Sequence, residues 1–178
     1  MIDSKINDVA TSLKLSAFID NHNQKKTGFP NLKNSLNSKN MQVAFDSISK
    51  WPNYEPTRLR NLNHVADFCG VRSVLYKDES TRFGLGSFKA LGGSYAITNL
   101  TKQYRAEGHL PSKITVATAT DGNHGRSVSW GAKLAGCNAK IFIHAEVSTE
   151  REKAMLDLGA DVIRINGNYD ASLAACKE

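Results

Sequence analysis

Two short segments of the sequence carry side chains whose types and spacing suit chemistry. The first is SFKALGG, residues 87–93, in which Lys89 stands between a phenylalanine and a pair of glycines. A helix is expected to begin here, and a helix N-terminus favours anions because its unpaired N–H groups carry partial positive charge. Lys89 is therefore either an ordinary solvated lysine or an amine kept for reaction. A buried lysine amine is a nucleophile that condenses with carbonyl groups.

The second segment is DGNHG, residues 121–125. Its two glycines let the backbone turn sharply and approach a ligand closely, and the helix expected behind them offers free N–H groups to a carboxylate or phosphate. Asn123 adds a donor and an acceptor, and Asp121 adds a carboxylate able to take a proton. The plainer alternative is a tight turn in which Asp121 caps the helix and His124 packs or caps. The Ser, His and Asp residues lack nucleophile-elbow spacing, which argues against a hydrolase triad.

The elements that must position these segments follow a regular alternation. We predict strands at 71–76, 113–120, 139–145 and 161–166, and helices at 61–69, 88–107, 124–135, 148–159 and from Tyr169. Strands that alternate with helices across short loops predict an α/β fold with a mainly parallel sheet and flanking helices, a three-layer sandwich. In such sheets ligands bind at the carboxyl ends of the strands, and both segments lie in strand-to-helix loops.

The composition is that of a globular protein without strong bias. The 178 residues are 40% hydrophobic and 22% charged, and the net charge of +6 is not gathered in a basic block, which argues against nucleic-acid binding. No apolar run suits a membrane span or a signal peptide. Cys69, Cys137 and Cys176 are odd in number and far apart, which favours a reducing, cytoplasmic setting and no metal site. Residues 1–50 are expected to form a polar N-terminal arm with a short helix.

Longer stretches around the two segments resemble a known family. KDESTRFGLGSFKALGGSYA, residues 77–96, closely resembles the lysine segment of fold-type II pyridoxal-phosphate enzymes, the superfamily of tryptophan synthase β and threonine dehydratase. DGNHGRSVSWGAKLAG, residues 121–136, is similar to their asparagine loop, and YEPTRLRNL, LGAD and NYD also fit. The aspartate that opens the loop points to the diaminopropionate ammonia-lyases. The resemblance runs from Tyr54 to the last residue, so residues 51–178 are expected to form the N-terminal part of such an enzyme.

The resemblance implies a role for each matching residue. Lys89 would hold pyridoxal 5'-phosphate as a Schiff base, with Phe88 beside the cofactor ring and Asn123 bonded to the phenolic oxygen of that ring. The backbone from Gly122 through Asn123 to His124 would hold the substrate carboxylate, and Asp121 would face Lys89 across the cofactor plane. The implied reaction is β-elimination of 2,3-diaminopropionate to pyruvate and ammonia, with a small amino acid as the substrate.

The sequence departs from the family in three respects. Gly86 replaces the asparagine before Ser-Phe-Lys, and Arg58 replaces the second proline of the entry motif. Family members are also longer, and their glycine-rich phosphate loop lies beyond the last residue of this chain. We therefore expect an incomplete family fold, weak cofactor binding by this chain alone, and either a homodimer or a missing C-terminal half as partner. Two alternatives stay open: a threonine or serine dehydratase-like lyase, and a catalytically inactive remnant that serves as a binding or dimerisation module.

Overall fold

The computed structural model describes Leu32 and residues 36–178. The chain divides into two compact units, Met1–Asn40 and Met41–Glu178. Most of the predicted polar arm lies outside the described residues. Helix α2, Ser38–Ile48, agrees with the short helix expected at the end of that arm.

A parallel sheet organises the second unit. Strands β3 (Thr115–Ala119), β4 (Asn138–His144) and β5 (Asp161–Ile165) pair in the order β3-β4-β5, and both pairs are parallel. Each strand is followed by a helix: α5 (Asn123–Ala135), α6 (Thr149–Leu156) and α7 (Tyr169–Lys177). The predicted α/β fold with a parallel sheet is confirmed.

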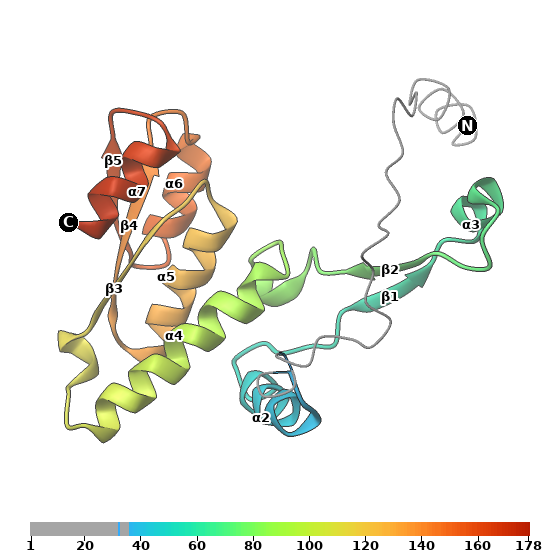
Figure 1. The fold of residues 1–178 in the computed structure, drawn as a ribbon, viewed down its shortest axis with the longest axis horizontal. Coiled ribbons are helices and arrows are strands. Elements are labelled where there is room, and N and C mark those ends of the chain that lie inside the picture. The colour runs from blue at the N-terminus through green and yellow to red at the C-terminus, as the bar shows by residue number, and fades with distance from the viewer. Residues whose placement is uncertain (1–31, 33–35) are drawn as a thin grey trace. The chain divides into compact units, whose positions relative to one another are not determined.

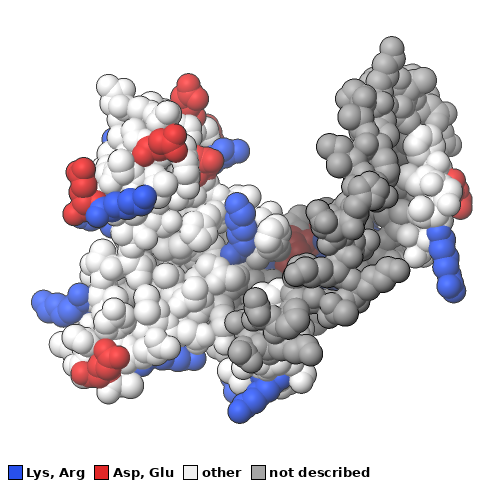
Figure 2. Space-filling model, viewed as in Figure 1, with Lys and Arg blue, Asp and Glu red and all other residues white. Residues whose placement is uncertain are grey.

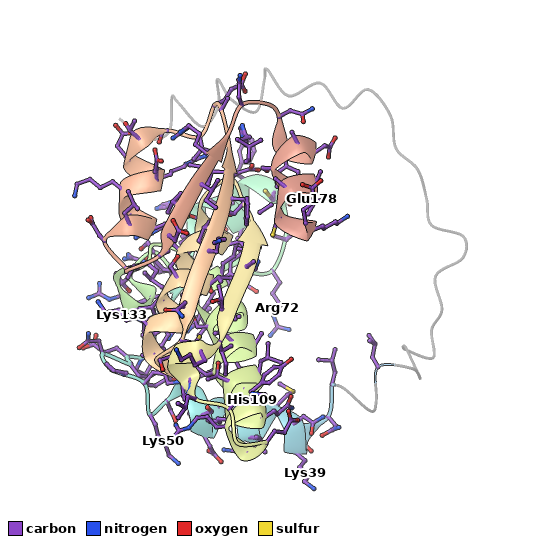
Figure 3. The ribbon with its side chains drawn as sticks, turned by 90° about the vertical axis from the view of Figure 1, so that its left-hand side faces the viewer. Lys39, Lys50, Arg72, His109, Lys133 and Glu178 are labelled. Carbon is purple, nitrogen blue, oxygen red and sulfur yellow. The ribbon has the colours of Figure 1, made fainter. Side chains whose placement is uncertain are left out.

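Helices cover both faces of this sheet, as a three-layer arrangement requires. Figure 3 shows Lys133 of α5 and Glu178, which follows α7, on opposite sides of the strands. Helix α4, Lys89–Ala106, packs against α5 and forms part of the same layer (Figure 1). The core lies between α5, α6 and β4, where Ile141, Ile143 and Met155 are completely buried.

The predicted strand at 71–76 is wrong in position and in pairing. The strand there is β2, Leu75–Asp78, and it pairs antiparallel with β1, Arg58–Asn61, instead of joining the parallel sheet. Helix α3, Asn63–Cys69, connects the two strands and ends at Gly70, whose φ of 63° is the left-handed conformation that glycine adopts easily. Two 3₁₀ turns, Arg82–Gly84 and Pro111–Lys113, complete the described elements.

Charged side chains are scattered over the described surface in view. Figure 2 shows Lys and Arg interspersed with Asp and Glu on this face of the described residues, without a continuous patch of either sign. None of the described helices combines the length and the apolar character that a bilayer crossing demands.

Candidate active site

The structure brings Lys89 and the asparagine loop, residues 120–125, to one cleft. This cleft has a volume of about 430 Å³ and lies beyond the carboxyl end of β3. Its lining includes every predicted site residue except Phe88: Lys89, Ala119, Thr120, Asp121, Gly122, Asn123, His124, Arg151 and Tyr169. Two segments that are more than thirty positions apart in the sequence therefore share one surface. The carboxyl-end rule for parallel sheets accounts for the asparagine loop, which follows β3, but not for Lys89, because β2 lies outside the parallel sheet.

A cluster of hydrogen bonds between α4 and α5 sets the position of Lys89. It joins Ser94, Ser127 and the Lys89 carbonyl, and we call it the serine lock. The Ser127 hydroxyl donates to the Lys89 carbonyl at 2.6 Å and accepts the Ser94 N–H at 3.1 Å, while the Ser94 hydroxyl donates to the Ser127 carbonyl at 2.8 Å. Small residues permit this approach, because a Cβ at Gly131 would lie 2.7 Å from the Ser94 Cα. The first turn of α4 is thereby tied to the second turn of α5.

Burial, which would make the Lys89 amine nucleophilic, is not seen in this structure. Lys89 is exposed, although it lines the cleft beside the asparagine loop. The Phe88 residue is 64% exposed and does not line the cleft. The role that the resemblance implies for Phe88 stays a prediction.

The asparagine loop is capped by a residue other than the expected one. Thr120 Oγ1 accepts the N–H groups of Gly122 and Gly125, each at 3.0 Å, and no Asp121 side-chain bond caps the helix. The plain alternative, in which Asp121 is the cap, is therefore wrong. The N–H groups of Asn123 and His124 have no acceptor within the described part of the chain. Two free N–H groups at the start of a thirteen-residue helix suit a carboxylate.

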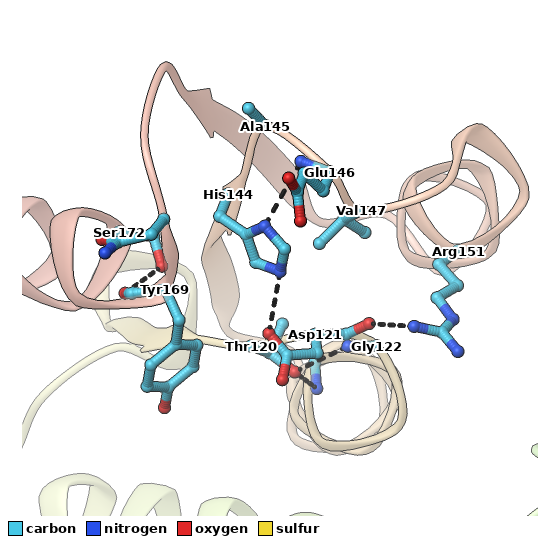
Figure 4. A network of polar contacts seen from close by, with 12 residues as sticks. Thr120, Asp121, Gly122, His144, Ala145, Glu146, Val147, Arg151, Tyr169 and Ser172 are labelled. Atoms are coloured by element: carbon cyan, nitrogen blue, oxygen red, sulfur yellow. Dashed lines mark hydrogen bonds and ion pairs between the residues drawn. The ribbon is translucent and has the colours of Figure 1, made fainter.

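The Asp121 side chain turns instead to the neighbouring strand. Figure 4 shows its Oδ1 beside His144 Nε2, at 3.1 Å, while the Asp121 carbonyl accepts from Arg151 Nη1 at 3.1 Å. Gly122 has a φ of 151°, and a Cβ there would lie 3.0 Å from the Arg151 Cδ. Glycine at this position lets Arg151 lie across the loop.

The imidazole of His124 is biased toward its neutral form. Burial lowers the His124 pKa below its ordinary value, and the nearby positive charge of Lys89 lowers it further. A neutral imidazole next to an ammonium group adds no second positive charge to the cleft. Lys89 and His124 both line the same cleft.

A buried arginine anchors the loop that leads to Lys89. Arg82, only 6% exposed, bonds both carboxylate oxygens of Glu79 at 2.8 and 2.9 Å and donates to Thr57 Oγ1 at 2.9 Å. Thr57 in turn contacts Glu79. The next residue, Phe83, stacks on Trp130 of α5 with 4.5 Å between ring centroids. The loop between β2 and α4, which leads to Lys89, is therefore held both to Thr57, just before β1, and to Trp130 of α5.

The backbone conformation explains why glycine is tolerated at position 86, where the family has asparagine. Gly86 has a φ of 75°, in the left-handed region. Glycine adopts this conformation freely, and asparagine is one of the few other residues that tolerate it. The replacement of asparagine by Gly86 therefore preserves the turn, although it removes a side chain near the cleft.

Four polar residues of the site were not predicted from the sequence: Thr120, His144, Arg151 and Tyr169. Thr120 and His144 could have been identified as site residues from the sequence, because both lie at the carboxyl ends of predicted parallel strands. Arg151 and Tyr169 lie in the first turns of α6 and α7 and resemble ordinary surface residues in the sequence.

Comparison with known proteins agrees with this geometry. Residues 50–178 match the family described as "Pyridoxal-phosphate dependent enzyme". Diaminopropionate ammonia-lyase of Escherichia coli (strain K12) is 45% identical over 140 residues, covering 72% of this chain and 35% of the relative. The same enzyme of Salmonella typhimurium (strain LT2) is 38% identical over 136 residues, covering 68% of this chain and 34% of the relative.

A solved structure gives the same result. The crystal structure of the Escherichia coli enzyme in complex with an aminoacrylate–PLP azomethine reaction intermediate superposes with a TM-score of 0.76 at 38% identity. The superposition covers 89% of this chain and 41% of that one. The resemblance predicted from the motifs is confirmed, and the chain spans about a third of the length of the curated relatives it matches.

Proposed function

The chain belongs to the family of pyridoxal-phosphate dependent enzymes, and on that basis we propose that it supplies the lysine and asparagine-loop half of a diaminopropionate ammonia-lyase site. The observation that carries the proposal is the shared cleft of Lys89, Asp121 and Asn123. The reaction is β-elimination of 2,3-diaminopropionate to pyruvate and ammonia. The similarity to the two bacterial ammonia-lyases supports this substrate class.

The residues present fit the cofactor. The cleft offers a lysine amine, an amide side chain and two unpaired N–H groups, which together suit an aldehyde, a phenolic oxygen and a carboxylate. Lys89 would hold the cofactor and Asn123 would bond its ring. Bound pyridoxal phosphate supplies the electron sink that stabilises negative charge at the substrate α-carbon.

The residues of this chain then divide the remaining work. The N–H groups of Asn123 and His124 hold the substrate carboxylate and so orient the α-proton. Asp121 would accept or return a proton on one side of the substrate, and a free Lys89 amine would do so on the other. Burial and the charge of Lys89 lower the His124 pKa, which disfavours a second positive charge beside the substrate carboxylate.

The proposal includes a partner and a compartment. Lys89 is exposed, and the chain covers 35% of its Escherichia coli relative, so we propose that further polypeptide closes the cleft, from a second copy or from the rest of a relative-length chain. The three cysteines are free thiols, which supports a reducing, cytoplasmic setting.

Absorbance spectroscopy tests the cofactor role of Lys89. We expect the chain mixed with pyridoxal phosphate to develop a visible Schiff-base band that Lys89→Ala abolishes. Lys102→Ala is the matched control, because Lys102 is an exposed lysine of the same helix. A band of equal strength in Lys89→Ala would refute the assignment. Pyruvate formation assayed with diaminopropionate, serine and threonine then distinguishes an ammonia-lyase from a dehydratase-like enzyme or an inactive remnant.

A further inference from the structure

Asp121, the carboxylate proposed to accept and return the substrate proton, makes one contact that the sequence motifs do not predict. His144 is the last residue of β4, the strand beside β3, and its Nε2 lies 3.1 Å from Asp121 Oδ1. The His144 side chain is 16% exposed, against 64% for Asp121. A largely buried ring therefore holds a carboxylate that is otherwise open to solvent (Figure 4).

The hydrogen bonds of His144 indicate which of its two ring nitrogens carries the proton that is donated to Asp121. The Glu146 N–H donates to His144 Nδ1 at 3.3 Å. A neutral imidazole that accepts at Nδ1 carries its proton on Nε2, so this nitrogen donates to Asp121 Oδ1. No residue among 36–178 hydrogen-bonds Asp121 Oδ2, which is left available to a ligand in the cleft.

The turn that carries His144 is itself held in place. Arg164 of β5 donates through Nη1 to the carbonyls of His144, Ala145 and Val147 at 3.2, 2.7 and 2.8 Å. Its Nη2 lies 2.6 Å from Glu152 Oε2. Bonds to a charged guanidinium are stronger than neutral ones, so the backbone that carries the His144 ring is firmly held.

Resting on the function proposed above, we propose that His144 is a positioning residue for Asp121. Its Nε2–H binds one carboxylate oxygen and thereby presents the other to the substrate proton. A carboxylate on a loop samples several rotamers, and a fixed donor restricts it to the one that suits proton transfer. Arg164 acts one step further away, by fixing the turn from His144 to Val147.

NMR of the full chain tests the contact without cofactor or turnover. With isotope-labelled histidine, we expect the Nε2–H tautomer at His144 and a shifted Nε2 resonance in Asp121→Ala. His144→Leu should move the carboxyl carbon resonance of Asp121. His144→Gln should leave that resonance near its wild-type position, because the glutamine amide also ends in an N–H donor. An Nδ1–H tautomer, or an Asp121 resonance unaffected by His144→Leu, overturns the proposal.

Kinetics give an independent result in any preparation that forms pyruvate from diaminopropionate. A misplaced catalytic group costs up to about a hundredfold in rate, so His144→Leu should lower kcat by roughly 10- to 100-fold with little change in KM, and His144→Gln should restore most of the loss. An unchanged kcat in His144→Leu refutes the positioning role. If the wild-type chain forms no pyruvate, that result counts against the proposed function, and the NMR result decides the role of His144.

Discussion

The two adjacent glycines near the start of α4, Gly92 and Gly93, should respond in opposite ways to the same substitution. A Cβ at Gly92 meets nothing within 4 Å, whereas a Cβ at Gly93 would lie 2.4 Å from Ser127 Oγ and 3.0 Å from Ser127 Cβ. Glycine in a helix is less stable than alanine by roughly 0.5–1 kcal/mol. Gly92→Ala should therefore raise the free energy of unfolding by about that amount.

At Gly93 the gain in helix stability from alanine is opposed, because the added Cβ would overlap Ser127 of the serine lock. The Ser127 hydroxyl cannot retreat without weakening its bonds to the Ser94 N–H and the Lys89 carbonyl. Overpacking costs about 1–3 kcal/mol, and each weakened hydrogen bond costs about 1 kcal/mol. We expect Gly93→Ala to lower the free energy of unfolding by about 1–3 kcal/mol after the helix gain is subtracted.

Urea denaturation followed by circular dichroism measures both variants under the same conditions. The double variant Gly93→Ala with Ser127→Ala removes the overlapping hydroxyl, and it should recover part of the loss if the overlap is the cause. A Gly93→Ala variant as stable as Gly92→Ala would rule out the overlap with Ser127. The overlap is also ruled out as the cause if the loss in Gly93→Ala is the same with and without the Ser127 hydroxyl.

Two further predictions concern α6 and the asparagine loop. Ser148 accepts the Arg151 N–H as the cap of α6, so Ser148→Ala should lower the free energy of unfolding by about 0.5–2 kcal/mol in urea denaturation, and an unchanged midpoint would contradict the cap. Because folding lowers the His124 pKa below 6.5, the unfolded chain binds a proton more readily, so stability should fall as the pH drops below 6.5 and be retained above it. An NMR titration in which His124 protonates above pH 6.5, or a His124→Gln variant with the same pH dependence, would contradict this.

Much of the fold could be predicted because its signals are local. The helix predicted from residue 148 does begin at a serine cap, Ser148, and the helix predicted to end at residue 69 is followed by its cap Gly70, because capping residues act within one turn. The position of Asn123 beyond the carboxyl end of β3 was predictable, but Lys89 reaches the same cleft because α4 packs on α5 and not because β2 joins the parallel sheet.

The errors arose where tertiary pairing decides. The apolar run at 71–76 suits a strand of either direction, and its partner at 58–61 contains two arginines and gives almost no strand signal alone. Thr120 and Asp121 are both good capping residues, and only the local geometry gives that role to Thr120. The exposure of Lys89 depends on what covers the cleft, which no local pattern encodes.

The contact between His144 and Asp121 depends on strand register. Ala119 of β3 pairs with Phe142 of β4, and the same offset carried two residues further places position 121 beside position 144. A register shift of one residue would turn the His144 side chain to the other face of the sheet. The alternation of strands and helices predicts that β3 and β4 are neighbours, but it does not supply this offset.

The serine lock has a consequence for the order of folding. Ser94 and Ser127 are separated by 33 positions, so the loop closed by their contact is short. Short loops close with a small entropic cost, and contacts of low sequence separation form early. During synthesis, α4 and α5 can therefore pack together as soon as residues 89–135 have left the ribosome. This packing brings Lys89 to the asparagine loop before the segments that follow are synthesised.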